Sequence, residues 1–125
     1  MLMFESLTGA KLKDCIMDDG VMFIVSENDM GKAIGRNGAN IKRIEGLLKK
    51  KVRLVEFNSD VTQFIANLLQ PLKVSDVKEE EGIVNIYADD TKTRGMIIGR
   101  DRNKINTLNE IVKRYFPVKD VKVAQ

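Results

Sequence analysis

The chain has 125 residues and contains no histidine, no tryptophan, two prolines and a single cysteine, Cys15. A lone cysteine excludes an internal disulfide, and the lack of histidine argues against a zinc site. It also argues against an enzyme, because histidine is the side chain most often used for general acid–base catalysis near neutral pH. We therefore expect no catalytic residue, no metal and no cofactor, and we expect Cys15 to be a small buried side chain.

Long apolar runs are absent as well. No run approaches the roughly 18 residues that a membrane span requires. The N-terminal stretch MLMFESLTG has neither a basic start nor a long apolar segment. These absences predict a cytoplasmic protein that makes no contact with a membrane.

Glycine is used in one unusual way, as a tight turn that occurs twice. Residues 34–41 read IGRNGANI and residues 98–105 read IGRDRNKI, which is 64 residues later. The match extends outward, because GVMFIV at 20–25 resembles GIVNIY at 82–87 with an offset of 62. An internal duplication of this kind predicts two structural units, which we place at residues 1–58 and 59–125.

Positive charge is concentrated around both turns, although the net charge of the chain is only +3. Residues 31–53 hold eight basic side chains against one acid, and residues 92–114 hold seven against two. The remainder of the chain is therefore acidic, with a net charge of −9. Positive charge beside glycine turns favours a polyanionic partner, since phosphates are attracted and counterions are released on binding.

The apolar pattern predicts a mixed α+β fold in which each half runs helix, strand, strand, helix, turn, helix, strand. In the first half Asp18-Asp19-Gly20 indicates a hairpin, and the cluster Ser26-Glu27-Asn28-Asp29 indicates a helix start. Ser59-Asp60 indicates the helix start that opens the second half, and Pro71 follows the end of that helix. The elements expected are helices at 1–7, 30–34 and 61–69, a short helix that ends at 98, and helices that carry the apolar residues of 41–48 and 105–112. The strands expected are at 12–17, 21–25, 52–57, 73–78, 83–88 and 118–123.

Each glycine turn lies between two helices and is suited to binding phosphate. The helix that follows the turn presents free backbone N–H groups at its start, where the helix dipole favours an anion. Glycine permits a close approach of the backbone and a positive φ. We expect Arg36 and Asn37 to point outward as donors, and Ile34 and Ile41 to anchor the turn from below.

The residues AIGRNGANIKRI at 33–44 resemble the signature of the KH domain, an RNA-binding module whose GxxG loop clamps the backbone of single-stranded nucleic acid. The element order resembles the type II, or bacterial-type, KH fold, with a three-stranded sheet packed on helices. The segment DVTQFIANLLQPLKV at 60–74 is similar to the corresponding region of the NusA family of transcription elongation and termination factors. The resemblance extends over nearly the whole chain, in tandem, and is closest to the short archaeal-type members.

The resemblance implies a single-stranded RNA-binding protein that acts in transcription termination, antitermination and elongation. It implies contacts to the RNA backbone from Gly35, Arg36, Asn37 and Gly38 and phosphate contacts from Lys42 and Arg43. It also implies an apolar groove floor that includes Ile34 and Ile41. The outer edge of the strand at 52–57 would read bases. The corresponding residues of the second turn are Gly99, Arg100, Asp101, Arg102 and Lys104. RNA polymerase is a further expected partner, and a monomer is expected.

The second turn departs from the KH pattern, because Arg102 stands where the pattern has glycine. A side chain there costs about 1 kcal/mol if the position needs a positive φ. Asp101 adds a negative charge near the expected phosphate. Arg102 could pair with Asp101 or reach a phosphate itself. We expect the second turn to bind RNA more weakly than the first or in a different way.

Three other functions fit parts of the sequence. A turn before a basic helix is also found in helix-turn-helix proteins, which bind duplex DNA. The acidic remainder could make the chain a scaffold that docks on RNA polymerase and binds RNA weakly. The acids Asp18-Asp19, Glu79-Glu80-Glu81 and Asp89-Asp90 could hold Mg²⁺ in an enzyme, although acids are common at turns and helix starts for local reasons. Base stacking on aromatic platforms is not expected, because no aromatic residue lies close to either turn.

Overall fold

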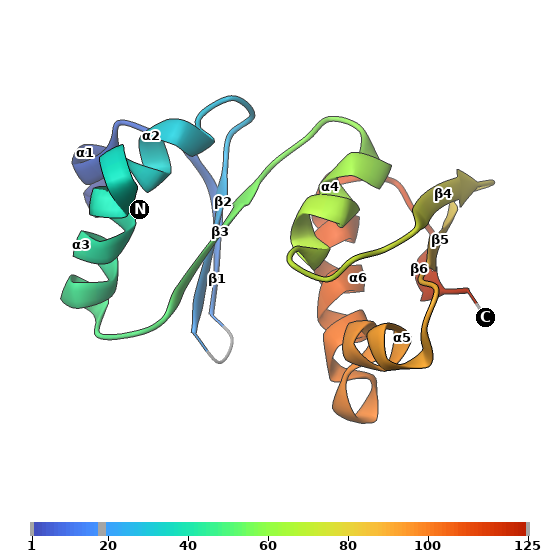
Figure 1. Cartoon of the computed structure of the whole chain (residues 1–125). Helices are drawn as coiled ribbons and strands as arrows, with labels where there is room; N and C mark the ends of the chain where they lie inside the picture. The colour runs from blue at the N-terminus through green and yellow to red at the C-terminus, as the bar shows by residue number, and fades with distance from the viewer. Residues whose placement is uncertain (1, 18–19, 125) are drawn as a thin grey trace. The chain divides into compact units, whose positions relative to one another are not determined.

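The computed structural model describes residues 2–17 and 20–124 and divides the chain into two compact units, Met1–Asn58 and Ser59–Gln125 (Figure 1). Met1, expected in the first helix, and Asp18-Asp19, expected at the first hairpin turn, lie outside the described residues. Within the described ranges, no helix has the length and apolar character needed to cross a membrane.

The first unit follows the predicted order. Its elements are α1 (Leu2–Thr8), β1 (Leu12–Met17), β2 (Val21–Val25), α2 (Met30–Ile34), α3 (Ala39–Leu48) and β3 (Val52–Glu56). The sheet has the order β1-β2-β3, in which β1 pairs with β2 antiparallel and β3 pairs with β2 parallel. The three helices gather on one face of this sheet (Figure 1). Since β3 pairs only with β2, one edge of β3 is not part of the ladder.

The core of the first unit lies between the sheet and its helices. Phe4 of α1 and Phe23 of β2 are fully buried, and their ring centroids are 4.5 Å apart. Ala33 and Ile44 bring α2 and α3 into the same cluster. Cys15, which was predicted to be buried, is only half-buried and packs against this cluster. Partial burial raises the pKa of the Cys15 thiol above its ordinary value.

Helix α2 starts at Met30 as predicted, with Asp29 at the N-cap position, but the Asp29 side chain does not cap it. Its carboxylate Oδ2 instead accepts a hydrogen bond from the backbone N–H of Lys11 at 2.9 Å. This hydrogen bond joins the start of α2 to Lys11, the residue that precedes β1. Asp29 therefore fixes where α2 lies relative to the sheet, which positions the turn at the other end of this helix.

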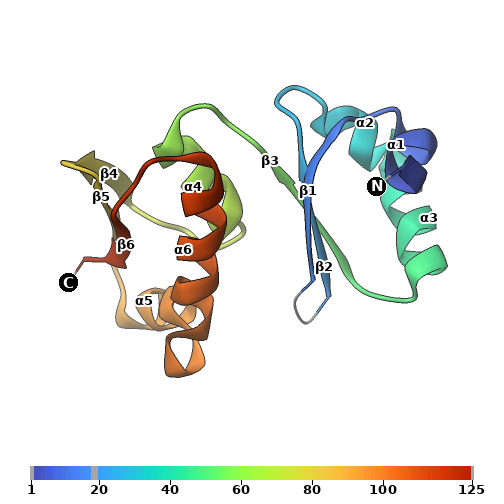
Figure 2. The same cartoon turned by 180° about the vertical axis from the view of Figure 1, so that it is seen from behind.

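The second unit repeats the order. Its elements are α4 (Val61–Leu69), β4 (Asp76–Glu80), β5 (Ile83–Tyr87), α5 (Thr91–Ile98), α6 (Asn103–Tyr115) and β6 (Asp120–Val123). The sheet order is β4-β5-β6, again with an antiparallel and then a parallel pair. Helices α4 and α6 lie together on one side of this sheet (Figure 2). Asp60 caps α4 by accepting a hydrogen bond from the N–H of Thr62 at 3.0 Å, as predicted.

Strands β4 and β6 both start later in the chain than the sequence predicted. Strand β4 starts at Asp76 rather than at residue 73, because the chain still turns after α4, where Leu72 N–H bonds to Leu69 C=O. Strand β6 starts at Asp120 rather than at 118, and Val118 packs into the core before the ladder begins.

The offset of 62 between 20–25 and 82–87 was wrong by one residue. It pairs core-facing Phe23 with the half-exposed Asn85, whereas the buried positions of β5 are Val84 and Ile86. A shift of one residue in a strand moves every side chain to the other face, so the apolar letters alone did not determine the register.

Candidate nucleic-acid interface

The first glycine turn, residues 35–38, joins α2 to α3. Gly35 has φ 77° and ψ 173°, a conformation that is essentially restricted to glycine. Its N–H ends α2 by donating to Gly31 C=O at 3.0 Å. A Cβ on Gly35 would lie 2.9 Å from the backbone nitrogen of Asn40, so the first turn of α3 leaves no room for a side chain.

The remainder of this turn is tight, as the sequence predicted, and it has a regular backbone. Arg36–Gly38 form a single turn of 3₁₀ helix, closed by a hydrogen bond from Gly38 N–H to Gly35 C=O at 3.2 Å. Asn37 and Gly38 both adopt the left-handed conformation, with φ of 56° and 74°. Helix α3 then starts at Ala39 without a capping side chain. Two consecutive left-handed residues turn the chain sharply and leave the turn exposed at the start of α3.

The second turn, residues 99–102, has nearly the same backbone. Gly99 has φ 76° and ψ 174°, and a Cβ there would lie 2.9 Å from the backbone nitrogen of Lys104. Asp101 and Arg102 adopt the left-handed conformation with φ of 54° and 64°. Arg102 therefore adopts the same left-handed conformation as Gly38 in the first turn, and this conformation is strained for a residue with a side chain. The position therefore has the positive φ that was the condition for a side chain to be costly there.

Basic side chains surround both turns and are exposed to solvent. Exposed residues of this kind are Arg36, Lys42, Arg43, Arg100, Arg102 and Lys104. Among the described residues, none of these six forms an ion pair within 4.0 Å, and the pairing of Arg102 with Asp101 that the sequence allowed is not formed. A cluster of positive side chains without internal partners attracts an external anion.

The apolar residues that flank the turns do not all lie where we expected. Ile34 was predicted to anchor the first turn from below, but its side chain is 38% exposed, while the preceding Ala33 is fully buried. The reason is the helical position, because α2 directs Ala33 and not Ile34 toward the core. Ile41 is half-buried and packs against the core, as an anchor should. Exposed Ile34 beside Gly35 remains compatible with an apolar groove floor.

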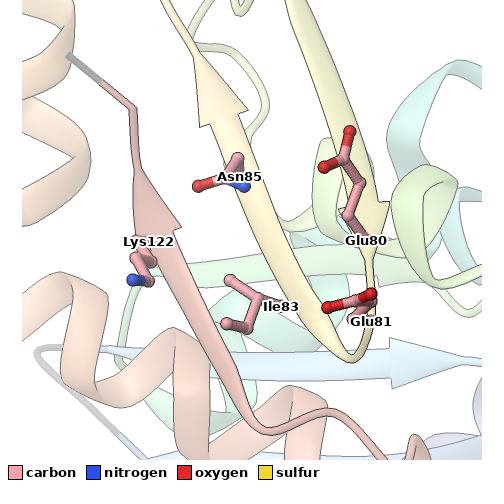
Figure 3. A pocket seen from close by; sticks show the side chains of 5 residues that line it. All are labelled: Glu80, Glu81, Ile83, Asn85 and Lys122. Atoms are coloured by element: carbon pink, nitrogen blue, oxygen red, sulfur yellow. The ribbon is translucent and has the colours of Figure 1, made fainter.

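Of the acids proposed as magnesium ligands, the structure describes Glu79-Glu80-Glu81 and Asp89-Asp90 but not Asp18-Asp19. Within residues 2–17 and 20–124 there is no group of three or more acidic, cysteine or histidine side chains able to hold a metal. Glu80 and Glu81 lie at the β4–β5 hairpin, beside a shallow hollow that Ile83, Asn85 and Lys122 also line (Figure 3). Their carboxylates point in different directions. Asp90 caps α5 by accepting a hydrogen bond from the N–H of Thr93 at 2.8 Å, and hydrogen bonds from Thr93 lower the pKa of Asp90.

Two residues that the sequence reasoning missed connect each turn-bearing helix to the edge of its sheet. Glu45 of α3 accepts a hydrogen bond from Val52 N–H at 3.0 Å. Asn109 of α6 bonds to both backbone groups of Val121 at 2.9 Å. Glu45 and Asn109 are 64 residues apart, which is also the spacing of the two turns. Aligning the two repeats in the sequence would therefore have shown them to be equivalent positions.

Comparison with known proteins agrees with this geometry. The KH domain family matches residues 1–81, which include the whole first unit and reach to the end of β4. The crystal structure of APE1850 aligns with a TM-score of 0.70 at 30% identity, covering 98% of this chain and 94% of that one.

Three archaeal relatives carry the name Probable transcription termination protein NusA. The protein of Halococcus morrhuae is 38% identical, with 98% of this chain and 90% of that protein aligned. The proteins of Methanococcus vannielii and Methanocaldococcus jannaschii are 35% and 32% identical, with 97% and 96% of this chain and 72% and 68% of those proteins aligned. The chain therefore belongs to the KH domain family, among the NusA-like transcription termination proteins.

Proposed function

We propose that this chain binds single-stranded RNA during transcription, and that its two units are tandem type II KH domains spanning residues 1–58 and 59–125. Both units have the order α-β-β-α-α-β, and both carry the third strand parallel to the second. The proposed role is that of a NusA-like factor in termination, antitermination and elongation, with nascent RNA as the ligand.

The observation that supports this proposal most strongly is the first turn. Gly35, Arg36, Asn37 and Gly38 form a narrow, exposed bend at the start of α3, within a region of positive charge. A KH domain clamps the sugar–phosphate backbone with such a turn. Arg36 and Asn37 add side-chain donors for the phosphates, and Lys42 and Arg43 on α3 continue the positive surface. In the second unit Gly99, Arg100, Asp101, Arg102 and Lys104 take the corresponding places.

RNA polymerase is the proposed protein partner, with the chain acting as a monomer in the cytoplasm and without a cofactor. A chain that bridges polymerase and transcript needs one surface for each, and we assign the acidic part of the sequence, outside the two basic windows, to the polymerase. The helix-turn-helix alternative fits less well, because a strand follows α3 directly and a hairpin precedes α2. In both units these strands make the turn part of a sheet-and-helix unit rather than of a free recognition helix.

A charge reversal in the first turn tests the proposal. Replacing Arg36 and Asn37 by aspartate keeps both glycines and places two carboxylates where phosphates would lie. We expect the dissociation constant for single-stranded RNA to rise by about tenfold or more, since charge-assisted hydrogen bonds are lost and repulsion is added. Circular dichroism should show an unchanged fold, because both side chains are exposed.

Two controls accompany this variant. Lys78→Asp, on an exposed position of β4, changes the charge as much as Arg36→Asp alone and should leave RNA affinity nearly unchanged. Duplex DNA as competitor should displace the RNA poorly. Unchanged RNA binding by the aspartate variant would show that the first turn is not the site, and efficient displacement by duplex DNA would favour the helix-turn-helix alternative.

A further inference from the structure

The two units differ at the edge of the third strand, close to the helix that follows each turn. In the first unit, Val21 N–H donates to Lys51 C=O at 3.0 Å and Phe57 N–H donates to Val25 C=O at 2.8 Å. In a parallel ladder, alternate residues of a strand bond to the neighbouring strand. Val52 and Leu54 of β3 therefore direct their backbone N–H and C=O groups away from β2, toward the open edge.

Glu45 covers only part of this edge. Its carboxylate accepts a hydrogen bond from Val52 N–H, and a carboxylate has no proton to donate to a carbonyl. Within the described residues, no side chain bonds to Val52 C=O or to Leu54 N–H. The acceptor Val52 C=O and the donor Leu54 N–H are therefore neighbouring groups on the open edge of β3.

Asn109 closes the equivalent place in the second unit. Its amide oxygen accepts from Val121 N–H at 2.9 Å, and its amide nitrogen donates to Val121 C=O at 2.9 Å. The same nitrogen donates to Ile105 C=O at 3.1 Å, which fixes the side chain on α6. Both edge-facing groups of Val121 are therefore occupied. Beyond Val121, only Val123 faces the edge before β6 ends.

The difference matters for a ligand made of nucleobases. Each base carries hydrogen-bond donors and acceptors next to one another on its Watson–Crick edge. A free carbonyl beside a free N–H can pair with such an edge and discriminate between bases, and bases in single-stranded RNA are available for this contact. A strand edge already bonded to an asparagine cannot do so without breaking that bond.

That the outer edge of β3 reads bases is what the resemblance to KH domains implies. We propose that Asn109 removes this readout from the second unit, so that base selectivity depends on Val52 C=O and Leu54 N–H of the first unit. The second unit then holds the RNA backbone without regard to sequence. The inference rests on the proposed function, because it assumes single-stranded RNA as the ligand. It assigns specificity-determining roles to Glu45 and Asn109, neither of which belongs to the glycine turns.

The substitution Glu45→Gln tests this inference with a change of one group. Glutamine has the same length as glutamate, and its amide can donate to Val52 C=O while still accepting from Val52 N–H, as Asn109 does for Val121. Affinities are measured for adenine, cytosine and uracil homopolymers of equal length, in single-stranded RNA. The spread is the ratio of the weakest to the tightest dissociation constant among the three homopolymers. We expect Glu45→Gln to reduce this ratio about fivefold to tenfold, which corresponds to the loss of one contact that discriminates between bases.

The matched control is Glu110→Gln, which removes the same charge from an exposed position of α6. It should leave the spread unchanged. Both substitutions make the protein more positive, so neither should weaken binding overall. A loss of selectivity with retained affinity in Glu45→Gln alone distinguishes edge closure from simple damage to the fold.

A second pair of variants acts on the backbone itself. Leu54→Pro removes the edge N–H without removing a ladder hydrogen bond, and proline is tolerated at strand edges. Val123→Pro makes the same change in β6. We expect the first to lower the spread and the second to leave it intact, with folding checked by circular dichroism.

The outcomes distinguish failure of the proposed function from failure of base selectivity at β3. If the wild-type protein binds none of the homopolymers, the proposed function is overturned and this inference with it. If it binds them all equally, the inference alone is overturned. The inference also fails if Glu45→Gln and folded Leu54→Pro both keep the full spread, or if Val123→Pro abolishes it.

Discussion

The turn of the first unit reads Gly35-Arg36-Asn37-Gly38, and that of the second reads Gly99-Arg100-Asp101-Arg102. Their backbone angles agree closely, with φ of 77° and 76° at the first residue and 74° and 64° at the fourth. The same bend is therefore built once with two glycines and once with a glycine and an arginine.

This comparison separates two reasons for glycine. At the first position, both the backbone angles and the lack of space exclude a side chain, since the start of the next helix lies 2.9 Å from a Cβ in each unit. At the fourth position only the angle favours glycine, because a Cβ on Gly38 would have nothing closer than 4.0 Å. The fourth residue can therefore vary at a modest cost, and the first cannot.

The largest effect should come from Gly35→Ala compared with Gly38→Ala. We expect Gly35→Ala to lower the free energy of unfolding by about 3 kcal/mol or more, since steric overlap adds to backbone strain. Gly38→Ala should cost only about 1 kcal/mol, the strain of a left-handed alanine. Urea denaturation of both variants measures the difference, and Gly99→Ala should repeat the larger loss in the second unit. Equal losses at positions 35 and 38 would contradict the steric argument.

Arg102→Gly makes the reverse change, because it gives the second turn the glycine that the first turn has at position 38. Glycine relieves the left-handed strain, so we expect the free energy of unfolding to rise by about 1 kcal/mol. We also expect tighter RNA binding at the second turn, because the backbone becomes accessible. The titration is best done in a chain that also carries aspartate at positions 36 and 37, so that the second turn dominates. No gain in affinity there would show that Arg102 is no handicap and contacts phosphate itself.

Much of the fold follows from local signals. The spacing of Ile41, Ile44 and Leu48 predicts α3, and the Asp60 cap followed by an apolar face predicts α4, because caps and helical periodicity are short-range effects. Strand starts and registers do not follow from local signals alone. The register of β5 depends on which of Val84 and Asn85 faces the helices, and only tertiary packing decides between them.

The candidate site was predictable in position but not in detail. Two glycines within a basic stretch of sequence predict the position of the turn. The sequence does not predict that Ile34 is exposed while Ala33 is buried, because this depends on the rotation of α2 against the sheet. Asp29 was expected to cap α2, and it bonds to Lys11 instead because the start of β1 lies within its reach. The bonds from Glu45 and Asn109 to the strand edges depend on helix–sheet contacts that no local pattern contains.

The salt dependence of RNA binding should reveal unequal use of the two turns. For single strands, the logarithm of the binding constant falls with the logarithm of salt concentration by about 0.7 for each phosphate contacted. Arg36→Asp should flatten this slope by about that amount. Arg100→Asp should flatten it less if the second turn engages RNA weakly. Titrations over a range of salt concentrations measure both slopes, and identical changes would mean that the two turns carry equal shares of the phosphate contacts.

The smallest expected effect concerns the helices that lead into the turns. Asp90 caps α5 through Thr93, and Asp29 provides no such cap for α2. The hydrogen bonds from Thr93 hold the pKa of Asp90 below its unfolded value, so their stabilisation is complete above that value and is lost as the pH falls through the folded pKa. We therefore expect the Thr93 amide resonance to shift as the pH is lowered below about 4. Asp90→Asn keeps an acceptor at the cap but cannot titrate, and should abolish the shift. A Thr93 resonance that still moves in Asp90→Asn would assign the titration to another carboxylate.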